Sequence, residues 1–296
     1  MIRLDKEQAA TLRPWFLPEK PGKLLGLHVI NTGHGSCWVD RWPNPRGVLV
    51  NSGLDYFLAG GTDALDGRTL RQITGWVDVA NDSLLRILRE ERQHLVPDDR
   101  LVLELVGKAN RGTTPSLESS TIRPLLPGDT GHLDGLSAEI SWIHNSWGGA
   151  EGLAASGHSW GAFVNGRLAS VACTFYVGDE YEDVGVVTEP EYRGLGLSAA
   201  CAAEVCDSVM SRGRRPTWLV SSQNPASLRV AQKLGFSTTG HLRFFGCGLQ
   251  EPPQPMDSLF LRSARFIARK CRSLFLDRST RVVAFIWLFD TPLFEF

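Results

Sequence analysis

Alternating apolar and polar positions are clearest in the second half of the chain. Asn165-Gly166 separates two apolar runs. This dipeptide favours a type I′ turn, because both central positions of that turn need a positive φ. The pattern therefore predicts a hairpin of residues 160–164 and 167–177. Further on, an apolar residue at every fourth position gives a helix over 197–211 one buried stripe: Leu197, Cys201, Val205 and Val209.

The same half contains shorter predicted elements. A helix is expected to open after Pro127-Gly128-Asp129, with Asp129 or Thr130 as its cap, and a second helix is expected over 225–234. Apolar runs also predict strands at 121–126, 183–188, 218–221 and 240–245.

The first half mixes strand and helix signals. Asn81 or Asp82 is placed to cap a helix that runs to about residue 95. Apolar runs predict strands at 24–30, 36–40, 47–51 and 101–106.

The segment 107–120 lacks periodicity and is rich in small polar residues, so it marks the predicted boundary. We expect an N-terminal α/β domain at 1–115, a second domain at 119–249 and a basic, apolar tail at 250–296. The fold class predicted is α/β (α+β), with a mixed, mostly antiparallel sheet and flanking helices in the second domain.

Composition narrows the classes of protein. Hydrophobic residues make up 43% and charged residues 21% of 296 residues, which is typical of a folded chain. The net charge of −1 argues against a general nucleic-acid binder. The longest apolar run, 282–289, is too short to span a bilayer. No signal-peptide pattern follows Met1, so we expect a cytoplasmic protein.

The tail has its own character, because the segment 259–281 is strongly basic. A docked surface helix followed by an edge strand is one interpretation. An interface with an acidic partner or a membrane surface is the other.

The cysteines predict no metal site. None of the six lies in a CxxC spacing, so neither a zinc ribbon nor a thioredoxin-like site is indicated. Cys173 and Cys201 fall inside apolar patterns and are expected to be small buried thiols.

Residues 184–198 contain the most informative chemistry. A predicted strand runs into a tight turn, Arg193-Gly194-Leu195-Gly196, which opens directly into a helix. Exposed amides at the positive end of a helix dipole bind phosphates, and glycine lets backbone approach the ligand closely. A structural turn is the competing interpretation. Ala199 stands where a dinucleotide-binding turn needs its third glycine, and no Gly-Lys-Ser/Thr follows for a P-loop.

These residues resemble a known family. Residues 190–198, PEYRGLGLS, look like the Arg/Gln-x-x-Gly-x-Gly/Ala acetyl-CoA motif of the GNAT N-acetyltransferases. Asn224-Pro225-Ala226-Ser227, followed by Lys233-Leu234-Gly235-Phe236, looks like the second family motif. Their order and separation are those of the family. Residues 37–40, 44–45 and 56–60 also resemble the N-terminal part of a two-part GNAT branch.

The resemblance implies a cofactor site for acetyl-CoA as co-substrate. Backbone groups of the strand 184–188 would line a cleft for the pantetheine arm, and an amide near Val186 or Val187 would polarise the thioester carbonyl. Asn224 would bind the pantetheine arm or cap its helix. The full set of implied cofactor-binding residues is Val186, Val187, Thr188, Arg193, Gly194, Leu195, Gly196, Leu197, Ser198, Asn224 and Ser227.

Two residues depart from the family pattern. Ser198 replaces the final glycine or alanine of the first motif, which is a mild change because serine is small. Ala231 stands where many members carry a tyrosine that protonates the leaving thiolate. This departure leaves the general acid open.

A basic group is needed if the acceptor is an alkyl amine, because such amines are protonated at neutral pH. Period-two alternation places Glu182 on the face of Val184, Val186 and Thr188, and we predict it as the catalytic base. A solvated acidic strand entrance, with Glu180 and Asp183, is the alternative. His158 and His144 are further candidates.

The sequence thus predicts an acetyl-CoA-dependent N-acetyltransferase that acts on an amine of a small molecule. A non-catalytic acyl-CoA-binding regulatory module and a protein or peptide N-acetyltransferase stay open as alternatives. We expect a small-molecule amine as the partner, with a homodimer left open, and no nucleic acid, membrane span or metal.

Overall fold

The structure is a computed structural model that describes residues 1–92, 94–111 and 120–249. The predicted tail at 250–296, with its basic helix and edge strand, lies outside these residues. Residues 1–249 form one compact unit.

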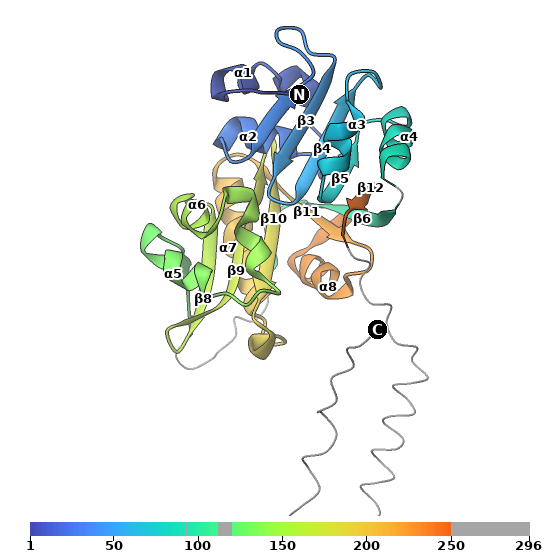
Figure 1. The fold of residues 1–296 in the computed structure, drawn as a ribbon. Helices are drawn as coiled ribbons and strands as arrows, with labels where there is room; N and C mark the ends of the chain where they lie inside the picture. Colours follow the sequence, from blue (N-terminus) through green and yellow to red (C-terminus); the bar gives the residue numbers. More distant parts are fainter. Residues whose placement is uncertain (93, 112–119, 250–296) are drawn as a thin grey trace, which may run out of the picture. The chain divides into compact units, whose positions relative to one another are not determined.

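A single mixed sheet runs through this unit, with the strand order β1-β2-β3-β4-β5-β12-β6-β11-β10-β9-β8-β7 (Figure 1). The pairs β4–β5 and β10–β11 are parallel, and the other described pairs are antiparallel. The predicted class, a mostly antiparallel mixed sheet with flanking helices, is confirmed. The strands are β1 Ile2–Arg3, β2 Ser36–Val39, β3 Gly47–Ser52, β4 Asp55–Gly60, β5 Gly75–Val79, β6 Leu95–Leu105, β7 Ser120–Pro124, β8 Ser159–Val164, β9 Arg167–Val177, β10 Tyr181–Thr188, β11 Arg215–Ser221 and β12 Phe236–Cys247.

Helices cover both faces of the sheet. The α-helices are α1 Lys6–Ala10, α2 Leu25–Thr32, α3 Gly67–Gln72, α4 Asp82–Glu91, α5 Thr130–Asp134, α6 Ala150–Ala155, α7 Leu197–Ser211 and α8 Pro225–Leu234. The short 3-10 helices are η1 Arg13–Phe16, η2 Pro127–Asp129, η3 Ser141–Trp147 and η4 Pro190–Tyr192.

Most local predictions of the second half are confirmed. The β8–β9 hairpin turns at Asn165 and Gly166, whose φ values are 51° and 76°. The bounds of α7 and α8 agree with those predicted, and Asp129 precedes α5 as its N-cap residue. In the first half, Asn81 caps α4 by accepting a hydrogen bond from the Leu84 amide, but the helix ends at Glu91.

The strand predicted at 24–30 is wrong, because α2 occupies Leu25–Thr32. Its first five residues are all buried, and the helix contacts β3 and β9. The run 24–30 is apolar except for His28, which is itself buried, so the pattern has no exposed polar face and does not distinguish a buried helix from a buried strand.

β6 joins the two halves of the chain. It is the last strand before the predicted boundary, yet it lies between β11 and β12. It pairs with β11 over Arg100–Glu104 and with β12 over its full length. The sheet is therefore continuous across the segment 107–120, and the proposed division into domains stays a prediction.

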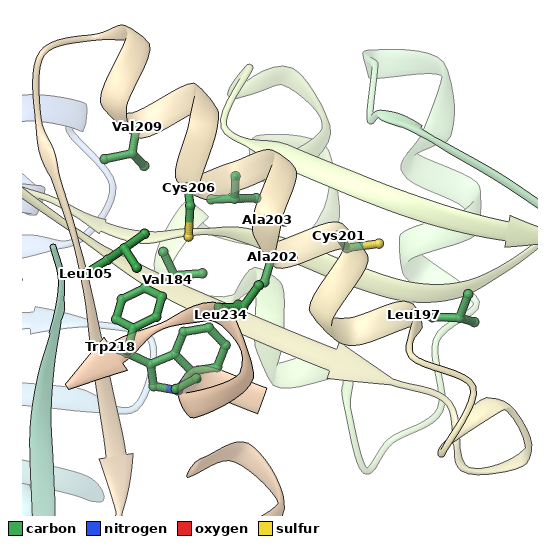
Figure 2. Close-up of a cluster of buried hydrophobic side chains, with 14 of the residues drawn as sticks. Leu105, Val184, Leu197, Cys201, Ala202, Ala203, Cys206, Val209, Trp218 and Leu234 are labelled. Carbon is green, nitrogen blue, oxygen red and sulfur yellow. The ribbon is translucent and has the colours of Figure 1, made fainter. Parts of the chain in front are cut away.

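α7 and α8 cover one face of the second half. Leu197, Cys201 and Val209 of α7 belong to the same buried cluster as strand residues such as Val184 and Trp218 (Figure 2). The opposite face of β8–β10 is covered by α5, η3 and α6. Cys173 and Cys201 are buried free thiols, as predicted.

Candidate functional site

The central feature of the site is the divergence of β10 and β11. The two strands pair in parallel only from Tyr181–Arg215 to Asp183–Thr217. Beyond that point β10 continues along β9 to Thr188, and β11 continues along β6 to Ser221. Within the described chain, the edge of β10 that faces β11 thus has no strand partner after Asp183. Backbone groups without partners are available to a ligand.

A glycine turn connects β10 to α7. Gly194 and Gly196 both have a φ of 81°, a conformation that favours glycine. A Cβ at Gly194 would meet open space, so the backbone there is accessible. Gly196 caps α7 without a side-chain hydrogen bond. The first-turn amides of α7 therefore have no side-chain cap at the positive end of the helix dipole.

The predicted cofactor residues of this turn differ in their surroundings. Leu195 is exposed, whereas Leu197 is buried in the α7 core. Ser198 is half-buried in the first helical turn. The Arg193 guanidinium donates hydrogen bonds to a Glu139 carboxylate oxygen at 2.6 Å and to the Thr188 carbonyl oxygen at 3.2 Å. An anion bound here would compete with Glu139 for Arg193.

The three predicted residues of β10 lie along its unpaired edge. Val186 packs against the α7 core, and Val187 packs on the opposite face with α5, η3 and α6. The Thr188 hydroxyl lies 2.8 Å from the Ser170 hydroxyl. The Val187 carbonyl oxygen accepts a hydrogen bond from the Ser170 hydroxyl at 2.7 Å, and the Thr188 carbonyl oxygen accepts one from Arg193. A cofactor would therefore contact the remaining backbone groups on the edge of β10 that faces β11.

The predicted cofactor residues at the start of α8, Asn224 and Ser227, make hydrogen bonds within the protein. The Asn224 side-chain oxygen Oδ1 accepts a hydrogen bond from the Ser227 backbone amide at 3.0 Å and so caps α8. The Ser227 hydroxyl accepts a hydrogen bond from the Trp218 indole, also at 3.0 Å. Ala231 belongs to α8 and is fully buried in the core shared with α7. A cofactor role for Asn224 and Ser227 stays a prediction.

Glu182, the predicted base, is fully buried beside the C-terminal end of α7. Arg212 and Arg214 pair with its carboxylate at 2.6 and 2.9 Å, and Thr174 donates to it at 2.6 Å. Burial alone would raise the Glu182 pKa, but these contacts and that of His158 hold it well below its usual range. A role as base stays a prediction. The surroundings argue against it, because the carboxylate is a weak base already bound by two cations.

The two histidine alternatives also lie in structural settings. His158 stacks on Trp147 with ring centroids 5.2 Å apart, and its Nδ1 lies 3.6 Å from the Glu182 carboxylate. His144 belongs to η3, and burial lowers its pKa.

Asp183 occupies the point of divergence, on the face opposite Glu182. Its carboxylate accepts hydrogen bonds from the Thr217 hydroxyl at 3.3 Å and from the Leu219 amide of β11. The side chain thus satisfies an amide where the parallel pairing ends. Burial raises the Asp183 pKa to about 8. The same strand therefore holds one carboxyl that favours its charged form and a neighbour that favours its neutral form.

A cavity of about 210 Å³ lies on this second face. Trp218 and Val220 pack in the α7 core, so alternation directs Leu219 to the cavity. Tyr176, the register partner of Asp183, also lines it. We call this space the Tyr176 cavity. Its lining is Trp15, Phe16, Leu17, Pro18, Lys20, Gly22, Lys23, Leu25, Gly26, Asp55, Tyr56, Phe57, Asp78, Ala80, Arg100, Tyr176, Leu219 and Phe244.

Sequence reasoning missed this cavity. Its walls come from η1, the segment after it, α2, β4, β5, β6, β9, β11 and β12, which only the fold brings together. The available signal was the presence of Asp55 and Asp78 in two otherwise apolar strands. Buried carboxylates are costly, so such positions often have a function.

The comparisons agree with these features. The family model described as GNAT acetyltransferase matches residues 134–245. An uncharacterized N-acetyltransferase from the mutA 5′ region of Streptomyces virginiae is 36% identical over 227 residues, which cover 76% of this chain and 95% of that protein. The [Ribosomal protein bS18]-alanine N-acetyltransferase of Escherichia coli K12 is 32% identical over 74 residues, covering 25% of this chain and 50% of that protein.

Solved structures share the fold. A GCN5-related N-acetyltransferase-like protein from Streptococcus suis has a TM-score of 0.64 at 18% identity, covering 81% of this chain and 98% of that one. A tandem GNAT protein from the clavulanic acid biosynthesis pathway has a TM-score of 0.51 at 11% identity, covering 85% and 99%.

A divergent strand pair followed by a glycine turn and a helix defines an acyltransferase of the GNAT type. On the strength of its Streptomyces relative, the chain belongs to the GNAT N-acetyltransferase family. Among the described residues, no helix is long and apolar enough to cross a membrane. The same residues contain no group of three or more His, Cys, Asp or Glu side chains suited to a metal.

Proposed function

We propose that this N-acetyltransferase uses acetyl-CoA to acetylate an amine of a small molecule. The observation that carries the proposal is the divergence of β10 and β11 beside the uncapped N-terminus of α7. In this proposal an extended thiol arm would lie between the two strands, and a pyrophosphate would bind at the helix end. The two parts of one cofactor would then occupy two adjoining features of the fold.

The turn would hold the pyrophosphate. Amides from Gly194 to Ser198 supply hydrogen-bond donors, and Arg193 supplies a positive charge once it exchanges Glu139 for phosphate. The pantetheine arm would pair with the free edge of β10 as an additional strand does. An amide of Val186 or Val187 would donate a hydrogen bond to the thioester oxygen, a contribution of about 2.7–4 kcal/mol in comparable acyl transfers.

Transfer then follows direct attack. The neutral amine nitrogen donates its electron pair to the thioester carbonyl carbon, and a C–N bond forms. The C–S bond breaks, and its electron pair leaves with the CoA thiolate. The amine proton passes to a base, and the thiolate is protonated from solvent because Ala231 cannot donate a proton. Asp55 lines the Tyr176 cavity and is better placed as that base than Glu182, which is enclosed by arginines.

The cofactor site is tested by a matched glycine pair. Gly194 and Gly213 have similar φ values, 81° and 75°, and a Cβ at either one would meet open space. They lie near opposite ends of α7. Backbone strain should therefore be similar in Gly194→Val and Gly213→Val, but only the first places a side chain at the proposed pyrophosphate site.

Calorimetry with acetyl-CoA is the measurement. We expect Gly194→Val to weaken acetyl-CoA affinity at least tenfold and Gly213→Val to leave it within twofold of wild type. Equal affinities in the two variants would contradict the site. Release of free CoA thiol that depends on added amine then tests transfer, with alkyl amines compared against a peptide N-terminus to distinguish the two acceptor classes.

A further inference from the structure

Five charged side chains line the Tyr176 cavity: Lys20, which is solvent-exposed, and Lys23, Arg100, Asp55 and Asp78. Lys23 pairs with Asp78 at 3.0 Å, so these two charges compensate each other. Arg100 pairs with Asp98 at 2.7 Å, and its guanidinium lies 4.1 Å from the Phe244 ring centroid. Asp55 differs, because no described cation lies within ion-pair distance of it. Its one described hydrogen bond comes from the Tyr176 hydroxyl at 2.7 Å.

Six of the 18 residues that line the cavity are aromatic. Trp15 and Phe16 of η1, Phe57 of β4 and Phe244 of β12 converge on the cavity from three separate segments. The Phe16 and Phe57 rings contact edge to face with centroids 5.8 Å apart. Aromatic faces attract cations and bury apolar groups equally well. A cationic ligand with an apolar body would therefore supply the counter-charge that the Asp55 carboxylate lacks, and would pack against the aromatic walls.

The cavity adjoins the proposed acyl-transfer site from the face opposite α7. Leu219 lies two positions beyond Thr217, where pairing between β10 and β11 ends. Tyr176 pairs in register with Asp183 at the same level. A ligand here would thus approach the opening between the strands from the side away from the pyrophosphate turn.

We propose that the Tyr176 cavity binds the acceptor, and that the acceptor is a compact amine with an aromatic or aliphatic body, whose ammonium group pairs with Asp55. This inference rests on the proposed function. The volume of about 210 Å³ is below the range of about 300–1,000 Å³ typical of sites for drug-sized ligands. The N-terminal half thereby becomes the part of the chain that selects the acceptor, since it supplies Asp55 and most of the aromatic wall.

The test measures binding rather than turnover. Phenethylamine, tryptamine and cyclohexylamine serve as probes, and 2-phenylethanol serves as a neutral analogue of the first. Calorimetry uses the full chain with and without acetyl-CoA. We expect at least one amine to bind the wild type, and 2-phenylethanol to bind at least tenfold more weakly than phenethylamine.

Two cavity variants and one control assign the site. Asp55→Asn removes the charge with little change of shape and should weaken amine binding at least tenfold. Tyr176→Phe removes the hydroxyl that donates to Asp55 and should have a smaller effect. Asp63→Asn changes an exposed carboxylate paired with Arg46 and should have none. Thermal unfolding checks that each variant is folded.

The outcomes separate this inference from the proposed function. Asp55-dependent amine binding without acetyl-CoA turnover supports the cavity assignment and contradicts the transfer chemistry. Acetyl-CoA turnover with amines that Asp55→Asn leaves unchanged overturns the cavity assignment alone. Absence of binding by all three amines, or preference for a peptide N-terminus, also overturns it.

Discussion

The pKa values of two neighbouring carboxyls on β10 are shifted in opposite directions: that of Glu182 is lowered and that of Asp183 is raised. Glu182 faces α7 and is held by arginines, whereas Asp183 is buried on the opposite face, where it accepts hydrogen bonds but has no ion pair within the described residues. Alternation along a strand is sufficient to separate them. Sequence patterning identified the acidic entrance to the cleft but favoured the residue on the α7 side.

Replacing Glu182 by Gln tests its structural role. Arg212 and Arg214 would lose their shared counter-charge, and because their side chains are 28% exposed we expect a loss of about 2–3 kcal/mol in unfolding free energy. The lowered pKa means that Glu182 stabilises the fold above its unfolded pKa, and that this contribution is lost as pH falls through the folded pKa. Urea unfolding across the acid range measures both effects.

The control is Glu180→Gln, an exposed neighbour, which should change neither quantity. The base hypothesis makes a different prediction for Glu182→Gln. A rate loss of about 10²–10³-fold with near-normal stability and partial recovery at alkaline pH would restore Glu182 as the base.

Asp183 predicts the opposite pH dependence. Its folded pKa of about 8 exceeds the ordinary value of 3.8, so the folded protein retains a proton that the unfolded chain releases between these limits. Stability should therefore fall as pH rises from about 4 to 8, by at most ~1.4 kcal/mol per pH unit from this group. Asp183→Asn should flatten the profile and be more stable than wild type at pH 8.5.

Thermal unfolding at several pH values measures this profile. Asn keeps an oxygen that can accept from Thr217 and Leu219, so the hydrogen bonds at the divergence are retained. Asp63→Asn is the exposed control. An unchanged slope in Asp183→Asn would show that other buried carboxyls, such as Asp55 and Asp78, dominate the profile.

At the scale of elements, the two helix caps Asn224 and Asn81 form a natural pair. Each accepts one backbone hydrogen bond at 3.0 Å, at the start of α8 and α4 respectively. Loss of such a cap costs about 0.5–2 kcal/mol. Asn224→Ala and Asn81→Ala should therefore destabilise the protein to a similar extent.

Only Asn224 lies at the proposed cofactor cleft. If its amide nitrogen also donates to the pantetheine arm, Asn224→Ala should weaken acetyl-CoA affinity about 2–13-fold, the equivalent of one net hydrogen bond. Calorimetry should show no such change in Asn81→Ala. Unchanged affinity in both variants would leave Asn224 with capping alone.

The helices differ in how well they could be predicted from the sequence. α7 and α8 were predictable because a stripe or a cap distinguishes each of them locally. α2 was not, because its buried Leu25, Leu27 and Val29 leave no polar face against which a period can be read. Its helical state is decided by packing on β3 and β9, which are distant in the chain.

The candidate site divides in the same way. The glycine turn that would bind the pyrophosphate is a local motif and was readable from Arg193 to Ser198. The cavity depends on pairing between strands far apart in sequence, which brings Asp55 of β4 within 2.7 Å of Tyr176 of β9. No local sequence pattern predicts the contact between Asp55 and Tyr176.

For the whole molecule, the position of β6 predicts that the two halves do not separate. A fragment of residues 119–249 would lack the strand that pairs with both β11 and β12. We expect it to be insoluble or to show no cooperative thermal transition, because two central strands would expose unpaired edges. A fragment of residues 1–249 is the control and should unfold cooperatively. A folded 119–249 fragment would instead support two independent domains.

The same strand has a consequence for synthesis on the ribosome. β6 leaves the exit tunnel before either strand that will flank it, and at about 5–20 residues per second it waits on the order of ten seconds for β12. Until then its apolar core residues Leu103 and Leu105 lack their final neighbours. The nascent chain therefore passes through a stage in which both edges of β6 are unpaired. We expect binding of chaperones to be strongest in that interval.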